Sequence, residues 1–284
     1  MKMTKVLVTI LCCFIPSKKK RKEIRNRLVK SRERRERLVD YGVTIEGDVA
    51  IAEGGLRFDI SDYAKACSHI REIVVAEAYN LSCEEDCVVI DIGMNRGIAS
   101  LFFAGKENVK KVYAFEPFEP TLVLAKKNLD LNPELSEKVQ TSACGLGRED
   151  TTLEIPYSVS VSDCMSTTHA VSVKQNVRTE TVVVKDAAQV LGPIFQENRG
   201  RRVIVKCDCE GAEFEILERL DEEGLVTRMD AVLMEYHFQK PDRLVKILTE
   251  NGFAVHVIHG SKQEPITGYL YAARMQEMGG GEAT

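Results

Sequence analysis

The sequence predicts an α/β protein built on a doubly wound, mostly parallel β-sheet. Three observations point to this fold class: a buried strand that runs into a glycine turn and a helix, a second strand that ends in an acid, and an alternation of strands and helices afterwards. The chain has 284 residues, of which 44% are hydrophobic and 29% charged, and this is enough for one large core.

The first strand, Val88–Ile92, runs into a glycine turn, and the helix that follows begins at Ile98. Gly93 allows the chain to turn sharply, and Gly97 allows the helix to pack close to the strand. Asn95 occupies the place of the second glycine of a pyrophosphate-binding loop. The turn therefore favours a ligand that has an adenosine but no phosphates, and S-adenosylmethionine is such a ligand.

The second strand, residues 112–115, ends in Glu116, which lies 23 residues beyond Gly93. An acid near this offset, at the tip of the second strand, can accept hydrogen bonds from both ribose hydroxyls of a bound nucleoside. Pro117 then stops the strand, and residues 118–131 are expected to form a helix. The turn and the acid together predict a nucleoside site.

The remaining elements continue the alternation with one interruption. Strands are expected at 139–143, 202–207, 231–234, 253–258 and 268–274, and a helix at 242–250. The interruption is the Ser/Thr-rich interval 151–185, which is expected to cover the site and contains two short alternating runs, Thr151–Ile155 and Thr179–Val184. Upstream, Ser61 is expected to cap a helix that runs toward Ala78, and residues 41–60 could form a short hairpin.

Five motifs follow one another along the chain: Ile90–Gly97, Phe115–Pro117, Ala143–Gly147, Val205–Glu213 and Glu235–His237. Together they resemble the FkbM-type methyltransferases, which use S-adenosylmethionine and mostly methylate hydroxyl groups on sugars and polyketides. The resemblance covers roughly residues 65–275. It implies a Rossmann-like class I methyltransferase fold over residues 61–276, with the fourth strand beside the first, the fifth beside the fourth, and an antiparallel strand near the C-terminal end.

The resemblance also implies which residues bind S-adenosylmethionine. They are Asp91, Gly93, Asn95, Gly97, Glu116, Pro117, Cys144, Gly145 and Asp208. One position departs from the family's pattern, because Val184-Lys185-Asp186 stands where a Leu-Asp-Asp-like step is usual. This departure weakens any role for Asp186.

Four side chains at strand tips are candidates for chemistry. Asp208 and Glu210 follow the fourth strand, and Glu235 and His237 follow the fifth, so three carboxylates and an imidazole should converge. A sugar hydroxyl is a weak nucleophile until its proton is removed, and His237 or Asp208 is expected to act as the base. Glu210 could do the same if burial raised its pKa; otherwise Glu210 and Glu235 hold the pair in place. The three carboxylates could also bind Mg²⁺, although no metal is assigned.

Each functional interpretation has a structural alternative. His237 could be a buried histidine with satisfied hydrogen bonds, and Glu235 could only orient a neighbour. Lys206 could pair with an acid at a strand end rather than touch a ligand. Glu213 could stabilise the first turn of its helix through the helix dipole.

The N-terminal residues 1–60 are expected to form a basic arm. Residues 1–40 hold fourteen Lys and Arg against four acids, although the whole chain has a net charge of −4. The apolar segment Val6–Ile15 is too short to span a membrane, because a helix rises about 1.5 Å per residue and the hydrocarbon core is about 30 Å thick. Followed by a Lys/Arg cluster, it favours an interfacial anchor on an anionic cytoplasmic membrane surface. The alternative is a solvated basic helix over residues 18–38 or a disordered tail.

Nucleic-acid binding is a weaker alternative, because Phe14 is the only aromatic residue among residues 1–40 available to stack on bases. The nine cysteines are scattered and odd in number, and no secretory signal is convincing. A cytoplasmic protein without a disulfide framework or zinc site is expected, with a flexible tail at 277–284.

Methyl transfer to a hydroxyl, on a sugar of a glycan or glycoconjugate, is therefore the predicted function. Two other classes stay open. A NAD-type oxidoreductase would need the phosphate-contacting glycine that Asn95 replaces. A protein domain that binds S-adenosylmethionine without catalysing a reaction would not need the three strand-tip carboxylates and His237. The oligomeric state and the acceptor are not indicated by the sequence.

Overall fold

The computed structural model describes residues 38–61, 63–80, 83–158, 165–170, 177–260 and 265–274. The predicted basic arm as far as residue 37, with its apolar segment, and the predicted tail at 277–284 lie outside these residues. None of the helices in the described part is long and apolar enough to cross a membrane.

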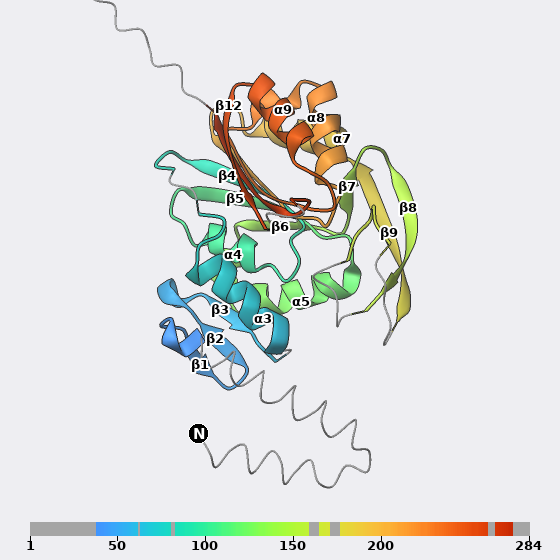
Figure 1. Ribbon diagram of the computed structural model, residues 1–284. Coiled ribbons are helices and arrows are strands. Elements are labelled where there is room, and N and C mark those ends of the chain that lie inside the picture. Colours follow the sequence, from blue (N-terminus) through green and yellow to red (C-terminus); the bar gives the residue numbers. More distant parts are fainter. Residues whose placement is uncertain are drawn as a thin grey trace, which may run out of the picture.

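The centre of the molecule is a seven-stranded sheet with the order β12-β13-β11-β10-β4-β5-β6 (Figure 1). Its strands are β4 (Cys87–Ile92), β5 (Val109–Phe115), β6 (Val139–Ser142), β10 (Arg202–Cys207), β11 (Ala231–Tyr236), β12 (Phe253–His259) and β13 (Gly268–Arg274). Strand β13 runs antiparallel to both of its neighbours, whereas β4, β5, β6, β10 and β11 are parallel. The predicted fold class is confirmed, including the fourth strand beside the first and the antiparallel strand near the C-terminal end.

Helices cover both faces of this sheet. On one face lie α3 (Tyr63–His69), the π-helix η2 (Ile70–Val75), α4 (Ile98–Ala104), α5 (Glu119–Asp130) and the short α6 (Pro133–Ser136). On the other face lie α7 (Ala187–Glu197), α8 (Glu213–Glu222), the 3-10 turn η4 (Leu225–Arg228) and α9 (Asp242–Glu250). Successive residues of β4 point to opposite faces, so Val89 packs in the first core cluster and Val88 and Ile90 in the second. The predicted helix from Ser61 toward Ala78 corresponds to α3 and η2, and it ends at Val75.

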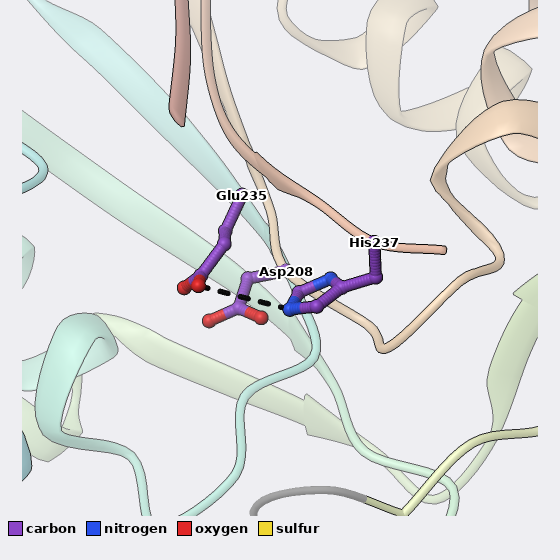
Figure 2. Close-up of side chains that lie close together, drawn as sticks. All are labelled: Asp208, Glu235 and His237. Carbon is purple, nitrogen blue, oxygen red and sulfur yellow. Dashed lines mark ion pairs between the residues drawn. The ribbon is translucent and has the colours of Figure 1, made fainter. Parts of the chain in front are cut away.

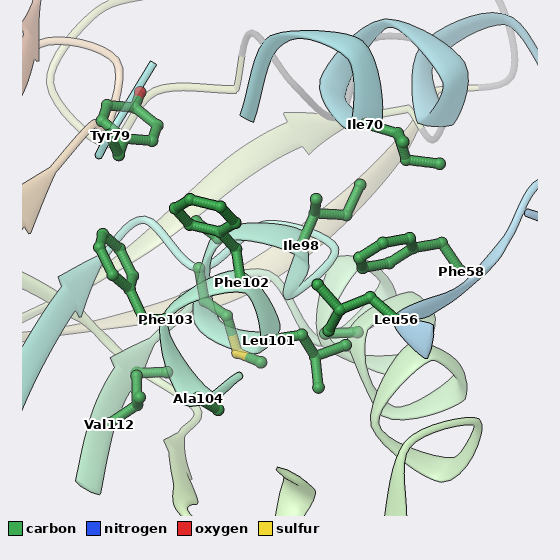
Figure 3. Packing of buried hydrophobic residues seen from close by; sticks show 14 of the residues in the cluster. Leu56, Phe58, Ile70, Tyr79, Ile98, Leu101, Phe102, Phe103, Ala104 and Val112 are labelled. Carbon is green, nitrogen blue, oxygen red and sulfur yellow. The ribbon is translucent and has the colours of Figure 1, made fainter. Parts of the chain in front are cut away.

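Residues 38–60 belong to the folded body. They form a three-stranded antiparallel sheet of β1 (Thr44–Glu46), β2 (Val49–Ile51) and β3 (Arg57–Asp59), with the turn η1 (Glu53–Gly55). Phe58 is fully buried and lies with Leu56 beside Ile98 and Leu101 of α4 (Figure 3). The folded part therefore includes the described residues from Leu38 onward, whereas the sequence suggested a boundary at residue 60. The proposed hairpin in 41–60 is present, with one strand more than expected.

Two asparagines of α5 and its C-terminal end hold this small sheet in place. The backbone N–H of Asp59 donates to Asn128 Oδ1 at 2.7 Å, and that of Arg57 donates to Asn132 Oδ1 at 2.9 Å. Both asparagine side chains are buried, so each amide replaces a strand partner for the edge strand β3. Hydrogen bonds with side chains of a distant helix therefore add to the apolar packing.

The interval between β6 and β10 forms a second sheet, β7 (Gly145–Gly147), β9 (Arg178–Asp186) and β8 (Thr151–Tyr157), in that order. The two alternating runs predicted in 151–185 are the antiparallel pair β8 and β9. Tyr157 stacks on Phe118 with ring centroids 5.3 Å apart, which fixes this sheet to the start of α5.

Asp186 has a structural role at the end of β9. Its carboxylate accepts hydrogen bonds from the backbone N–H groups of Ala188 and Gln189, and so caps the N-terminus of α7. The same carboxylate pairs with Arg219 of α8, with Nε and Oδ2 3.0 Å apart. Burial alone would raise its pKa, but these bonds and the arginine charge lower the pKa below its ordinary value.

We expect Phe58→Ala to lower the free energy of unfolding of the whole domain by about 3–5 kcal/mol, because it opens a cavity in the main core. Val39→Ala is the matched control, since Val39 is exposed, and its effect should stay within about 0.5 kcal/mol. Urea unfolding followed by circular dichroism measures both. If Phe58→Ala unfolds like the parent chain, residues 38–60 are not part of the cooperative unit.

Candidate active site

A cavity of about 240 Å³ lies beyond the carboxyl ends of β4, β5, β10 and β11, where strand order reverses between β4 and β10. Most of the predicted site residues line it: Gly93, Asn95, Glu116, Pro117, Gly145, Asp208, Glu210 and Glu235. Four other predicted residues, Asp91, Gly97, Cys144 and His237, do not line it, and each has another place in the structure.

Gly93 brings the first strand into contact with the fourth. It has φ +81°, and a Cβ atom there would lie 1.8 Å from the carbonyl oxygen of Asp208. No other residue can occupy this position without moving the backbone of one of the two loops. Gly97 has φ +74° and caps the start of α4, where a Cβ atom would meet Met94 Cε at 2.9 Å. Gly97 thus shapes the turn rather than the cavity wall.

Glu116 is buried at the tip of β5 and fastens the turn. Its Oε2 accepts the backbone N–H of Asn95 at 2.9 Å, and its Oε1 accepts that of Phe118 at 3.1 Å. Each carboxylate oxygen has a second lone pair, which leaves acceptor capacity toward the cavity. Burial raises the pKa of Glu116 to about 7, against the opposing effect of the two N–H bonds and of Lys206.

Asn95 provides a second polar group for a ligand. Its φ is +50°, which is uncommon for a residue other than glycine, and such backbone strain collects at ligand sites. Its Oδ1 is buried and has no hydrogen-bond partner among the described residues, so a donor from a ligand would satisfy it. On the opposite wall, Pro117 and Gly145 pack closely, since a Cβ on Gly145 would lie 3.3 Å from Pro117 Cβ. Cys144, beside it, is half-buried against the second core cluster.

Lys206 and Asp91 form a buried ion pair under the turn. Lys206 Nζ lies 3.1 Å from Asp91 Oδ1 and donates to the carbonyl oxygen of Gly93 at 2.7 Å. Asp91 Oδ2 accepts a hydrogen bond from Ser100 Oγ at 2.5 Å. Burial lowers the pKa of Lys206, but the charges of Asp91 and Asp208 outweigh it and raise this pKa above its ordinary value. Lys206 thus pairs with an acid near a strand end, as its structural interpretation expected, and it also lines the cavity.

The predicted catalytic residues Asp208, Glu235 and His237 lie close together (Figure 2), and Asp208 and Glu235 of this cluster line the cavity. His237 Nε2 lies 3.7 Å from Glu235 Oε1 and 3.8 Å from Glu210 Oε2. Asp208 Oδ2 accepts a hydrogen bond from the buried hydroxyl of Tyr79 at 3.0 Å. The expectation that three carboxylates and one imidazole converge at adjacent strand tips is met.

Glu213 has a role at the site that the sequence did not reveal. It is fully buried, and its Oε1 lies 3.1 Å from His237 Nδ1. The same carboxylate accepts the backbone N–H groups of Cys209 at 3.0 Å and Gly211 at 2.9 Å. It therefore orients the imidazole and also holds the loop that carries Asp208 and Glu210. Its position three residues after Glu210 was visible, but an acid in the first turn of a helix is common for other reasons.

The acids and the histidine shift one another's pKa values. Burial lowers the pKa of His237, but its bond with Glu213 and the charges of Glu213, Glu210 and Asp208 outweigh this and raise it to about 9. Burial, and then the charge of Asp208, raise the pKa of Glu235 to about 8. The cluster has an excess of negative charge in a partly dehydrated place, so it attracts a cation or a proton near neutral pH.

Part of the interval 151–185 covers the site, as expected. Met165 and Thr167 line the cavity, and Ser166 Oγ donates to the carbonyl oxygen of Glu210. His169 stacks on Phe238, with ring centroids 4.2 Å apart and planes inclined by 22°. Phe238 has φ +64° and is 41% exposed, so a strained backbone presents an aromatic ring beside His237.

Comparison with known proteins identifies the family of this chain. The family model described as "Methyltransferase FkbM domain" matches residues 91–255. "Methyltransferase 1" of Beauveria bassiana (strain ARSEF 2860) is 31% identical over 223 residues, which cover 70% of this chain and 88% of that protein. The chain belongs to the FkbM methyltransferase family.

Other similarities are more distant. "Methyltransferase sdnD" of Sordaria araneosa is 27% identical over 177 residues, 54% of this chain and 68% of that protein. Among solved structures, the methyltransferase FkbM from Methylobacillus flagellatus KT has a TM-score of 0.45 at 16% identity, over 68% of this chain and 45% of that chain. The human methyltransferase 10 domain containing protein also has a TM-score of 0.45, at 14% identity, over 79% of this chain and 91% of that chain.

This FkbM-type enzyme is therefore a methyltransferase, which decides against the NAD-type oxidoreductase. The family uses S-adenosylmethionine, and three observations fit that cofactor here. Gly93 leaves the turn without a side chain, Glu116 keeps acceptor capacity for hydroxyl groups, and Asn95 Oδ1 is buried without a partner among the described residues. None of these groups offers a cation to a pyrophosphate.

We expect binding of S-adenosylhomocysteine to weaken as the pH falls through about 7, because Glu116 accepts hydroxyl groups best as a carboxylate and its pKa is about 7. One pH unit below the pKa leaves about a tenth of the group ionised, so the Kd at pH 6 should be about tenfold that at pH 8. Calorimetry at both pH values measures it.

Glu116→Gln is the matched control, since it keeps an acceptor oxygen and removes the titration. Its affinity should be lower at pH 8 and nearly independent of pH. An equal pH dependence in the parent and the variant would mean that another group causes it.

Proposed function

We propose that the chain transfers the methyl group of S-adenosylmethionine to a hydroxyl group, on a sugar of a glycan or glycoconjugate. The observation that carries the proposal is the cluster of Asp208, Glu235 and His237 on one side of a cavity whose other side fits a nucleoside. A methyltransferase whose acceptor is already a good nucleophile has little need of such a cluster, whereas an alcohol must lose its proton.

The proposed methyl transfer breaks two bonds and forms one bond between carbon and oxygen, and it releases one proton. The acceptor O–H bond breaks, its oxygen attacks the methyl carbon, and the bond between that carbon and the sulfonium sulfur breaks. S-Adenosylhomocysteine leaves as a neutral thioether, and one proton goes to the cluster and then to solvent. Because the donor is already activated, the remaining work is to hold the oxygen in line and to assist its deprotonation.

The charges at the cavity support a neutral or cationic acceptor. Five acids line it: Glu72, Glu116, Asp208, Glu210 and Glu235. Two cations, Arg96 and Lys206, also line it, and Lys206 is neutralised by Asp91. A phosphate near this wall would be repelled, which argues against nucleic acid as the acceptor.

An aromatic surface supports an acceptor with a ring. Phe238 is partly exposed next to His237, and the flat apolar face of a sugar can pack against such a ring. The test is incubation with labelled S-adenosylmethionine and a panel of uncharged glycosides and amino sugars, with mass spectrometry of the product. If the chain binds the cofactor but methylates no hydroxyl of the panel, while it methylates amines, the O-methyl proposal is wrong.

We expect His237→Ala and Asp208→Asn to lower turnover by about 10²–10⁴-fold, the usual contribution of a group that assists proton removal. The Kd of His237→Ala for S-adenosylhomocysteine should change little, because His237 does not line the cavity. His256→Ala, at an exposed position of β12, is the matched histidine control and should keep full turnover. Near-normal turnover in both site variants would exclude a chemical role for the cluster.

We further propose that the basic arm attaches the enzyme to anionic membranes on the cytoplasmic side. The support is the segment Val6–Ile15 followed by the Lys/Arg cluster at 18–22. Deleting residues 1–37 should abolish sedimentation with phosphatidylserine vesicles at low salt and leave the thermal unfolding of the domain unchanged. Full-length protein that does not sediment with such vesicles would disprove the attachment.

A further inference from the structure

We propose that Asp208, Glu235 and His237 bind a hard divalent cation of the Mn²⁺ or Mg²⁺ type, with Glu213 as the residue that orients His237. One ligand atom from each of the three side chains lies within 4.8 Å of the other two. Two carboxylates and one imidazole are a suitable donor set for such an ion. The catalytic role of the ion rests on the proposed hydroxyl methylation, whereas the binding of the ion does not.

The spacing fits donors around an ion better than it fits direct hydrogen bonds. An ion at about 2.1 Å from each donor holds neighbouring donors about 3 Å apart and opposite donors about 4.2 Å apart. His237 Nε2 is 3.7 Å from Glu235 Oε1, which is too long for a hydrogen bond. A protonated imidazole facing a carboxylate directly would close to about 2.7–2.9 Å. A pair of donors at the upper limit of 4.8 Å would need to approach by about half an ångström.

The second observation is the partner of His237 on its far side. A metal-bound histidine almost always donates its other ring N–H to a carboxylate or carbonyl, which fixes the tautomer and the direction of the ring. Here Nδ1 of His237 meets the fully buried Glu213 at 3.1 Å, so Nε2 faces Glu235 and Glu210. His237 is more than nine-tenths buried, and its Nε2 makes no hydrogen bond with the described residues.

Charge balance gives the third reason. Asp208, Glu210 and Glu235 face the same space, and Lys206 is shared with Asp91 and lies 3.9 Å from Asp208 Oδ2. A divalent cation would relieve the repulsion among these carboxylates. It would also bind the acceptor hydroxyl, lower the pKa of that hydroxyl, and hold its oxygen beside the methyl group.

The test uses Mn²⁺ alone, added to the full-length chain after chelator treatment, with the signal of free Mn²⁺ followed by electron paramagnetic resonance. We expect one bound Mn²⁺ per chain. Asp208→Asn and His237→Ala should each lower the affinity at least about tenfold, and Glu213→Gln by about 10–100-fold. Pulsed electron paramagnetic resonance should detect coupling between Mn²⁺ and a nitrogen nucleus in the parent chain. The coupling should be absent in His237→Ala.

Glu72→Gln is the matched control, because it removes one carboxylate from the cavity wall without touching the three ligands. It should keep the nitrogen coupling and most of the affinity. Binding of S-adenosylhomocysteine by each variant checks that it is folded. The inference is overturned if the parent chain binds no Mn²⁺, or if the bound Mn²⁺ shows no nitrogen coupling and is insensitive to the ligand variants.

The catalytic consequence has its own readout. Methyl transfer should fall after chelator treatment and recover with Mn²⁺ or Mg²⁺. Full transfer in chelator, together with no Mn²⁺ binding, would overturn the cation site and leave the proposed O-methylation intact. Bound Mn²⁺ without any methyl transfer to sugars would instead support the site and count against the proposed function.

Discussion

The buried ion pair of Lys206 and Asp91 is the constraint on which the site depends. A lysine ammonium inside a protein is costly unless a carboxylate and further acceptors surround it. Here the acceptors are Asp91 and the carbonyl oxygen of Gly93, so the charge fixes the turn after β4 to the C-terminal end of β10. Gly93 then meets the backbone of Asp208, two residues after the lysine. One buried charge thereby sets the distance between the nucleoside side and the chemical side of the cavity.

A second buried carboxylate organises the chemical side in a similar way. Glu213 accepts two backbone N–H groups from its own loop and contacts the imidazole of His237, which comes from the next strand. The loop after β10 and the end of β11 are thus connected by a group without solvent contact. Because hydrogen bonds from two backbone N–H groups fix the Glu213 carboxylate, the imidazole bound to it has little freedom to turn its Nε2 away from Glu235. A side chain that takes part in catalysis or binding must be held in one position by its neighbours, and Glu213 holds His237 in this way.

The sequence could predict those parts that depend on local patterns. The apolar run of β4, the glycines that follow it and the acid at the tip of β5 each have a local signal, and the structure contains all three. The sheet order came from family resemblance. The roles of Asp91 and Glu213 could not be separated from those of ligand-contacting acids, because only the fold decides which acid faces the cavity and which faces a buried partner. The attachment of residues 38–60 depends on Asn128 and Asn132, about seventy positions away, and no local pattern reveals such a bond.

Strained backbone marks the same places. Four described residues other than glycine have positive φ values: Glu77, Asn95, Glu210 and Phe238. The last three lie in the loops after β4, β10 and β11. Such conformations cost about 1–3 kcal/mol each and persist only where the surroundings require them. The backbone N–H of Asn95 donates a hydrogen bond to Glu116, and this bond holds Asn95 in its conformation. The backbone carbonyl oxygen of Glu210 accepts a hydrogen bond from the hydroxyl of Ser166, which holds Glu210. At Phe238 the ring stacks on His169 above Gly211, where a side chain would not fit. Asn95 and Glu210 line the cavity, and Phe238 lies beside His237, so the backbone strain in these three loops is concentrated around the proposed active site.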